Sequence, residues 1–381
     1  MDEPSARGLR RRVLIYAPHL LPQSQPWLRQ HAELLPGYET ALAGRRRIRD
    51  GLEPGPLASF CIDDHPRAAW QGSLLVLTGR SPGLETFIRR FQPALIHAHF
   101  APGATEVMGI AGRLGVPLVV SCHGWDAHIA GRSLYERCHL ARRSRLFRQS
   151  ALVLAASAML RTRMLALGAD PARTEVHYLG IDRDRFDGRR CDDGRPRIAM
   201  VGRLVPSKGT GLALEALRLL LQRVPGATLE IVGDGPDRAG LERIAATRRL
   251  PVVFHGARSQ ADVRDVLARA RVFCFPSTAA DRLQPEALGL AAAEAQAMGV
   301  PVVACATGGI PEVVAEGVGG LLVPDGDAVA LAAGLERLLT DGALHSRIAE
   351  AGRGFVAERF DLRRNLARLA DRYTALLDAP R

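Results

Sequence analysis

Lysine is nearly absent from this chain of 381 residues, because all but one of its 51 basic residues are arginine. Aromatic residues make up only 5% and are not interleaved with the arginines, which argues against a surface that stacks on nucleic-acid bases. None of the six cysteines forms a CxxC pair, so their spacing fits no zinc site and is typical of reduced core residues. No apolar run is long enough to span a membrane or to form a signal-peptide core, so we expect a cytoplasmic protein.

The remaining composition is that of a large globular protein. Hydrophobic residues make up 47% of the chain, and its length favours two domains. The net charge of +11 lies mostly in the first half. A basic half of this kind suits nucleic acid, anionic lipid or a phosphorylated substrate as its partner.

Short apolar runs alternate with helical patterns along the whole chain, which predicts parallel α/β sheets. Continuous apolar runs are expected of parallel strands that are covered on both faces. The predicted strands of the first half are residues 13–17, 74–77, 95–98, 118–121 and 152–155. Those of the second half are residues 198–201, 229–232, 252–254, 272–275, 302–304 and 321–323.

Two sheets in one chain predict two Rossmann-like domains that face a central cleft, where ligands usually bind. We place the domains at residues 1–186 and 187–360, with a polar linker at 187–196. An arginine-rich amphipathic helix over residues 362–377 belongs to a last segment, 361–381, which we expect to pack back on the first domain.

The single lysine, Lys208, lies in VGRLVPSKGTG, where a predicted strand turns into a helix. A lysine ammonium is a compact point charge, unlike the planar fork of arginine. Its place beside glycines at such a turn indicates a phosphate site, and the alternative is that codon bias left one lysine there by chance.

Three spaced motifs extend this interpretation: GRLVPSKG, then EALGLAAAE with Glu286 and Glu294, then GGIPE. GDGP at residues 233–236 accompanies them. Together they resemble the nucleotide-sugar half of glycosyltransferase family 4, a family of retaining enzymes with the GT-B fold. The resemblance covers residues 198–327 well and the first half loosely, where it is similar to the polysaccharide-assembly branch.

The resemblance implies a donor diphosphate held by Arg203 and Lys208, with backbone N–H groups from a helix that starts near Gly209. Gly202 belongs to the same turn. Gly289 and Leu290 lie where backbone amides of the family approach the sugar and the phosphate, although many members have proline in place of Gly289. No metal and no other cofactor are then required.

The two glutamates have implied roles as well. Glu286 corresponds to the carboxylate that meets the donor sugar hydroxyls, and Glu294 to the one that accepts hydrogen bonds from the ribose. Base contacts in the family are largely main-chain, near residues 254–258, which include Arg258. The alternative is that both glutamates are solvated helix residues with no such role.

In the first half, SCHGWDAHIAG follows a predicted strand, and His123 and Asp126 match the family's HG-x-D turn. His123 is therefore expected to touch the donor, with Asp126 supporting it; the alternative is that His123 only caps the strand. After the first strand, Ser24 is expected to be the N-cap of a helix whose open end faces donor phosphate or acceptor, and a plain N-cap serves equally well.

Two acidic triplets and a pair of histidines resemble metal-binding patterns, but we do not favour a metal site at any of them. Asp182–Arg183–Asp184 lies in the family's GID-like junction, and Asp325–Gly326–Asp327 precedes a helix that an aspartate would cap. For HAHF, residues 97–100, we place the two histidines on opposite faces of a strand, find no third ligand, and reject a zinc site.

The sequence thus predicts a metal-independent retaining hexosyltransferase that uses a nucleoside-diphosphate sugar and a saccharide or lipid-linked acceptor. The basic helix over residues 136–149 fits an anionic membrane at the inner face of the plasma membrane, and a merely solvated arginine face explains it equally well. The alternatives are an epimerase on the same fold and a basic nucleic-acid-binding protein. Donor sugar, base and acceptor stay open.

Overall fold

The computed structural model describes residues 10–49, 51–186, 190–280 and 284–379. The chain forms two compact units. The N-terminal unit comprises Met1–Tyr178 and Arg363–Arg381, and the C-terminal unit comprises Leu179–Leu362.

The expected domain boundary after residue 186 therefore differs from the observed one, which follows Tyr178. The reason is a backbone contact: Ile181 N donates to Phe360 O at 2.8 Å, and Leu362 N donates to Ile181 O at 3.1 Å. These bonds hold the stretch after Tyr178 in the C-terminal unit. The predicted linker at 187–196 falls inside that unit, and its residues 187–189 lie outside the described residues.

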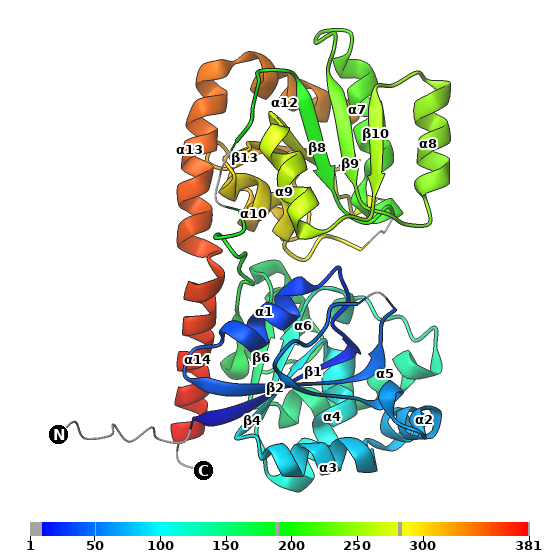
Figure 1. Ribbon diagram of the computed structural model, residues 1–381, viewed down its shortest axis with the longest axis vertical. Coiled ribbons are helices and arrows are strands. Elements are labelled where there is room, and N and C mark those ends of the chain that lie inside the picture. The colour runs from blue at the N-terminus through cyan, green and yellow to red at the C-terminus, as the bar shows by residue number, and fades with distance from the viewer. Residues whose placement is uncertain (1–9, 50, 187–189, 281–283, 380–381) are drawn as a thin grey trace, which may run out of the picture. The chain divides into compact units, whose positions relative to one another are not determined.

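The N-terminal unit is built on a parallel sheet of seven strands in the order β3-β2-β1-β4-β5-β6-β7 (Figure 1). The strands are β1 (Arg11–Leu20), β2 (Tyr38–Arg47), β3 (Ala58–Cys61), β4 (Leu95–His99), β5 (Leu118–Cys122), β6 (Leu152–Ala155) and β7 (Thr174–Val176). Its helices are α1 (Pro26–Leu34), α2 (Ala68–Thr78), α3 (Pro82–Phe91), α4 (Ala101–Leu114), α5 (Leu134–Gln149), α6 (Ala158–Ala166) and α14 (Leu362–Asp378).

One predicted strand of this unit is wrong and three strands were missed. Residues 74–77 belong to α2, which ends at Gly79 in the left-handed conformation. A short apolar run does not distinguish a strand from a helix by its periodicity. The missed strands are β2, whose end carries three consecutive arginines, and the short edge strands β3 and β7.

The C-terminal unit has a parallel sheet of six strands in the order β10-β9-β8-β11-β12-β13, and every strand predicted for it is confirmed. The strands are β8 (Arg197–Val201), β9 (Thr228–Val232), β10 (Val252–Gly256), β11 (Val272–Phe275), β12 (Val302–Cys305) and β13 (Gly320–Val323). Its helices are α7 (Thr210–Leu220), α8 (Arg238–Thr247), α9 (Gln260–Arg269), α10 (Leu290–Ala297), α11 (Ile310–Val313), α12 (Ala328–Thr340) and α13 (Gly342–Arg359).

The strand order of each sheet reverses once, between β1 and β4 and between β8 and β11. Strands on the two sides of such a point send their following loops in opposite directions, which leaves a crevice at their carboxyl ends. Two Rossmann-like parallel sheets are thus confirmed, and each has one place where ligand-binding loops are expected.

The C-terminal helix α14 packs on the N-terminal unit through buried polar contacts. Tyr373 is fully buried, and its hydroxyl bonds His97 Nδ1 in β4. The Tyr38 hydroxyl of β2 lies 2.7 Å from Thr374 Oγ1. The last helix therefore helps to order the interior of the first sheet.

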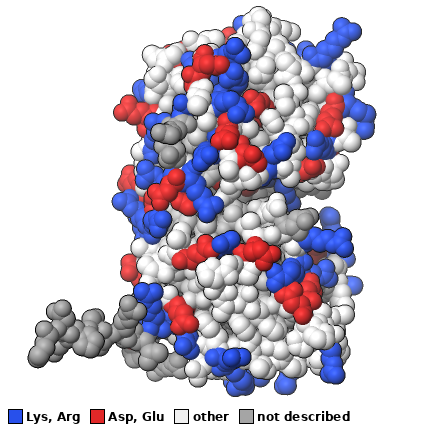
Figure 2. All heavy atoms as spheres, in the orientation of Figure 1, with Lys and Arg blue, Asp and Glu red and all other residues white. Residues whose placement is uncertain are grey.

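Charges of both signs are interspersed over the face shown in Figure 2, rather than gathered into one basic patch. Many are paired at the surface, as are Arg12 with Glu39 and Arg223 with Glu336. Each such exposed pair contributes little stability. The arginines are distributed among acidic residues on this face (Figure 2).

We expect Gly180→Ala to destabilise the protein by about 3 kcal/mol, because an added Cβ would lie 2.2 Å from Leu362 Cα and 2.5 Å from Leu362 N. Thermal unfolding checks this. The matched control is Gly112→Ala in α4, where an added Cβ meets nothing within 4 Å and stability should stay equal or rise by up to about 1 kcal/mol. Equal melting points for both variants would contradict the steric argument.

Candidate active site

The turn after β8 carries Lys208, whose Nζ forms an ion pair with Glu286 Oε2 from the segment after β11. The two side chains are 22% and 14% exposed, so the pair is partly shielded from water. It links the loops on both sides of the point where the strand order reverses. The structure thus brings together two predicted residues that are 78 positions apart in the chain.

Gly209 allows this close approach. It adopts φ +66°, and an added Cβ would lie 1.9 Å from Pro276 O, just beyond β11. The neighbouring backbones are bonded as well, because Thr278 N donates to Ser207 O at 2.9 Å. The turn that holds Lys208 is therefore pressed directly against the loop that leads to Glu286.

The GGIPE segment holds the main chain of Glu286 in place. Gly309 N donates to Glu286 O at 2.8 Å, and an added Cβ on Gly308 would lie 2.2 Å from the same oxygen. Ser277 Oγ donates to Glu286 Oε2 at 3.3 Å. The glycines of this motif act by bringing backbone close to the Glu286 main chain.

Two helices begin beside the ion pair without a side-chain cap. Gly209 is the N-cap of α7, and Gly289 is the N-cap of α10, whose first residue is Leu290. The first N–H groups of a helix have no partner inside it and favour anions. Gly289 has φ +100°, which proline does not adopt, and an added Cβ would lie 2.6 Å from the Phe275 ring.

Glu294 lies one turn into α10 and is partly buried. Burial raises the pKa of this carboxyl to about 8. Its side chain makes no hydrogen bond or ion pair with any residue that the structure describes. A partly buried, protonated carboxyl gains from a hydroxyl ligand, since a hydroxyl both donates and accepts.

The other predicted donor residues differ in their placement. Gly202 joins the same turn, and an added Cβ would lie 3.9 Å from Lys208 Cδ. Arg203 is adjacent and exposed. Arg258 is exposed too, but it follows β10 at the edge of the sheet, and within the described ranges no bond joins it to Lys208 or Glu286.

In the N-terminal unit, Asp126 fixes the loop after β5. Its Oδ2 accepts from His123 N at 2.6 Å, and its Oδ1 accepts from Ala101 N at the start of α4. Asp126 is 1% exposed, so it supports the loop from inside. His123 lies against the Trp27 ring of α1, with 4.6 Å between ring centroids.

The expectation that Ser24 caps α1 is wrong. The N-cap is Gln25, with no side-chain cap bond, and Pro26 is the first helical residue. A proline fits the first helical position because its missing N–H has no partner there anyway, and this sets the helix start one residue later than expected. Ser24 itself is exposed.

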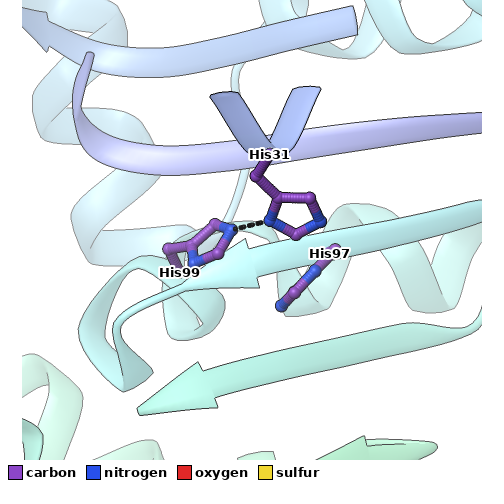
Figure 3. Close-up of side chains that lie close together, drawn as sticks. All are labelled: His31, His97 and His99. Atoms are coloured by element: carbon purple, nitrogen blue, oxygen red, sulfur yellow. Dashed lines mark hydrogen bonds between the residues drawn. The ribbon is translucent and has the colours of Figure 1, made fainter. Parts of the chain in front are cut away.

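The argument that separated His97 from His99 is also wrong. Residues two apart on a strand share a face, so both imidazoles point the same way from β4. His31 of α1 completes a buried group whose ligand nitrogens all lie within 4.8 Å of one another (Figure 3). No sequence signal pointed to His31, because it lies on α1, 68 residues before His99.

The acidic triplets make the structural contacts expected of them. Asp182 Oδ2 accepts from Arg185 Nε at 3.0 Å, and Asp327 caps α12 by accepting from Ala330 N at 2.9 Å. Asp325 Oδ2 accepts from Ala279 N at 3.0 Å. Each of these three carboxylates thus holds a nearby segment in place.

Comparison with known proteins finds two family models, whose matches overlap at residues 182–185. The model described as Glycosyl transferases group 1 matches residues 182–355, and the model described as Glycosyltransferase Family 4 matches residues 41–185. The first covers the Lys208–Glu286 pair and both helix starts; the second covers the His123 loop.

Relatives and solved structures agree with these matches. An amylovoran biosynthesis glycosyltransferase of Erwinia amylovora is 32% identical, over 84% of this chain and 79% of its own. A putative colanic acid biosynthesis glycosyltransferase of Salmonella typhimurium is 32% identical, over 71% and 69%. Anabaena HepE, solved in complex with UDP and glucose, shares the fold with a TM-score of 0.76 at 20% identity, over 95% and 99%.

We expect Glu294→Gln to change how stability depends on pH. Because the pKa is raised from its ordinary 4.5 to about 8, the folded state keeps a proton that the unfolded chain releases. Wild-type stability should therefore fall as pH rises from about 4.5 to 8, a loss the glutamine variant escapes. At pH 8 the variant should gain about 2 kcal/mol or more over wild type relative to pH 5, or roughly 4–8 °C in melting point.

The control for this measurement is Glu350→Gln on the exposed part of α13. It should melt in parallel with wild type across the same pH range. A Glu294→Gln variant whose melting point also runs parallel to wild type would contradict a raised pKa at Glu294.

Proposed function

Because the chain belongs to glycosyltransferase family 4, we propose that it moves a sugar from a nucleoside diphosphate to an acceptor hydroxyl with retention at the anomeric carbon. Glycosyl transfer in polysaccharide or glycolipid assembly is the activity of its relatives, such as the amylovoran enzyme. The nucleoside-diphosphate donor, retention and independence of metal are our proposals.

The Lys208–Glu286 pair is the observation that carries this proposal. An ammonium has three donors, of which Glu286 takes one, so Lys208 keeps donors for phosphate oxygens. The starts of α7 and α10 add backbone N–H groups on the same edge of the sheet. With the exposed Arg203, these groups would stabilise the charge of the departing diphosphate without a divalent cation.

Glu286 has a second task in this proposal. A carboxylate that is held beside Lys208 and the two helix starts would accept hydrogen bonds from sugar hydroxyls. It would thereby orient the anomeric carbon. Glu294, one helical turn beyond Leu290, would meet the ribose hydroxyls. Retention follows if the acceptor attacks from the face that the diphosphate leaves, and the departing phosphate takes the acceptor's proton.

The two rival functions have less support. An epimerase needs acid and base carboxylates in the N-terminal unit, where Asp126 is committed to backbone N–H groups and Glu106 to Arg45. A nucleic-acid-binding protein needs a continuous basic surface, and charges of both signs are mixed over the face in Figure 2.

For the acceptor side we propose an anionic membrane as partner. Three large apolar side chains are exposed on α2 and α5: Trp70 at 55%, Leu77 at 49% and Leu134 at 58%. Arg142 of α5 donates to Val76 O at 2.7 Å and to Leu77 O, so the two helices lie side by side. Exposed apolar side chains thus lie on two neighbouring helices, one of which is rich in arginine.

The chemistry of this α2–α5 surface suits lipid headgroups. Exposed arginines of α5, among them Arg145 and Arg148, would face the phosphates, while Trp70 and Leu77 would enter the interface. No helix in the described part of the chain has the length and hydropathy needed to cross a bilayer. In this proposal the α2–α5 surface contacts the membrane from one side, where it would meet a lipid-linked acceptor.

We expect Lys208→Ala to lower turnover at least about a hundredfold, or roughly 2.7 kcal/mol, with little change in melting point, since Lys208 is a partly exposed side chain. Activity is followed with UDP-, GDP-, ADP- and TDP-sugars and a saccharide acceptor, and NMR of the product reports the anomeric configuration. Arg223→Ala, which removes another cation of the same unit, is the control and should keep full activity. Unchanged turnover in the Lys208 variant, or an inverted product, would refute the proposal.

We expect the protein to float with vesicles of phosphatidylcholine and phosphatidylglycerol and not with phosphatidylcholine alone, and salt should weaken the binding. Arg145→Glu with Arg148→Glu should reduce binding at least about tenfold, at about 1 kcal/mol for each cation. Trp70→Ser with Leu77→Ser should reduce it as well. Arg89→Glu with Arg90→Glu on α3 is the matched control; equal losses in that control would argue against a defined surface.

A further inference from the structure

Three histidines form a hydrogen-bonded row that runs from the loop after β5 into the N-terminal unit. His123 Nε2 lies 3.0 Å from His99 Nδ1. His99 Nε2 lies 3.2 Å from His31 Nδ1, the contact drawn as a dashed line in Figure 3. The outer nitrogens, His123 Nδ1 and His31 Nε2, are buried and have no hydrogen-bond partner among the described residues. We call His123, His99 and His31 the histidine chain.

Each ring of the chain holds a single proton at neutral pH. Burial lowers the pKa of both His31 and His123 to about 3, and it holds the pKa of His99 well below its ordinary value of 6.5. The histidine chain contains no carboxylate that would favour a charged imidazole. Three neutral rings therefore share three protons among six nitrogens.

Two of these protons must occupy the two contacts, because each contact joins one N–H to one bare nitrogen. If His99 donates from Nδ1 to His123, its Nε2 is bare and accepts from His31 Nδ1, and His123 carries its proton on Nδ1. If His123 donates from Nε2 instead, His99 and His31 must both carry theirs on Nε2. All three rings are then Nδ1–H, or all three are Nε2–H.

We propose that His99 and His31 are positioning residues that set which nitrogen of His123 carries its proton. This rests on the proposed function, together with the donor contact that the sequence resemblance implies for His123. His123 Nδ1 is buried without substrate, so a sugar reaches it only when the groups that cover it move aside. It then donates to a sugar oxygen when it carries the proton, and accepts from a hydroxyl when it is bare. Whether His123 carries its proton on Nδ1 or Nε2 therefore depends on whether His31 Nε2, two rings away, is bare or protonated.

The surrounding contacts keep the rings in this arrangement. Trp27 and His31 share a face of α1, and Trp27 packs on His99 and His123 with ring centroids 5.2 Å and 4.6 Å away. His97 lies beside the chain but bonds elsewhere, to the Tyr373 hydroxyl and at 2.8 Å to Ser121 Oγ. His97 is thus held out of the row.

The spacing of His31, His97 and His99 also suits a metal ion. We favour the hydrogen-bonded chain because the nitrogens of His31 and His99 already bond each other, and those of His97 bond Tyr373 and Ser121. A divalent ion would also bring two positive charges into a buried group without an anionic ligand. The test must therefore distinguish metal binding from the hydrogen-bonded chain.

The test is ¹⁵N NMR of protein labelled at histidine, in which two-bond ¹H–¹⁵N couplings report the tautomer of each ring. Single His→Phe variants at residues 31, 99 and 123 assign the signals. We expect one shared tautomer for all three rings. Different tautomers within the row would overturn the proposal, as would one equivalent of Zn²⁺ that stays bound and shifts the signals of His31, His97 and His99 together.

Activity gives a second readout. In His31→Phe the end of the row is lost, so His99 and His123 should show mixed tautomers, and kcat should fall about tenfold while KM changes less than twofold. His31→Asn places an amide where Nδ1 was and should restore both the tautomer and kcat. His65→Asn, at an exposed site, is the control. A kcat loss that asparagine does not restore, with tautomers unmoved, would overturn the positioning role.

These readouts separate the inference from the proposed function. NMR is recorded on the full chain without substrate, so a shared tautomer supports the coupling even if no nucleotide sugar is turned over. Absence of transfer with every donor would refute the proposed function alone. If His31→Phe does not fold, the wild-type tautomers still decide the coupling.

Discussion

The ion pair between Lys208 and Glu286 is the contact on which the C-terminal site depends. It joins two loops that leave the sheet on either side of the reversal in strand order, and the loops meet only because glycines let their backbones touch. Gly209 against Pro276 and Gly308 against Glu286 are approaches that any side chain would block. The geometry of the charges is therefore fixed by backbone packing, which is stiffer than the two long side chains themselves.

The two sheets share one strand order except for the extra edge strand β7, but they offer different chemistry where that order reverses. In the C-terminal unit a cation, a carboxylate and two uncapped helix starts meet, which suits a charged ligand. In the N-terminal unit the corresponding edge carries neutral histidines under Trp27, which suits hydroxyl groups. Under the proposed function, the C-terminal unit would supply groups for the donor phosphate and the N-terminal unit would supply groups for hydroxyls.

Much of the fold and of the candidate site could be predicted from the sequence, and particular residues show why. Continuous apolar strands and the glycines of GRLVPSKG and GGIPE report local requirements, so the sheets and the Lys208 and Glu286 loops could be placed. The run at 74–77 could not be assigned, because its burial in α2 depends on partners elsewhere in the chain. The histidine chain was missed because His31 lies 68 residues from His99, and only the fold brings them together.

The single lysine gains a physical reason from the structure. Its stem runs along Gly202, and its ammonium meets one oxygen of Glu286 that also accepts from Ser277. A guanidinium is broad and planar and binds a carboxylate best through two parallel bonds. Such a fork would engage Glu286 more fully and leave fewer donors aimed at a phosphate. With the proposed phosphate ligand, a compact charge that bonds both the carboxylate and the ligand would fit this turn better, which would explain a lysine here in a chain that otherwise uses arginine.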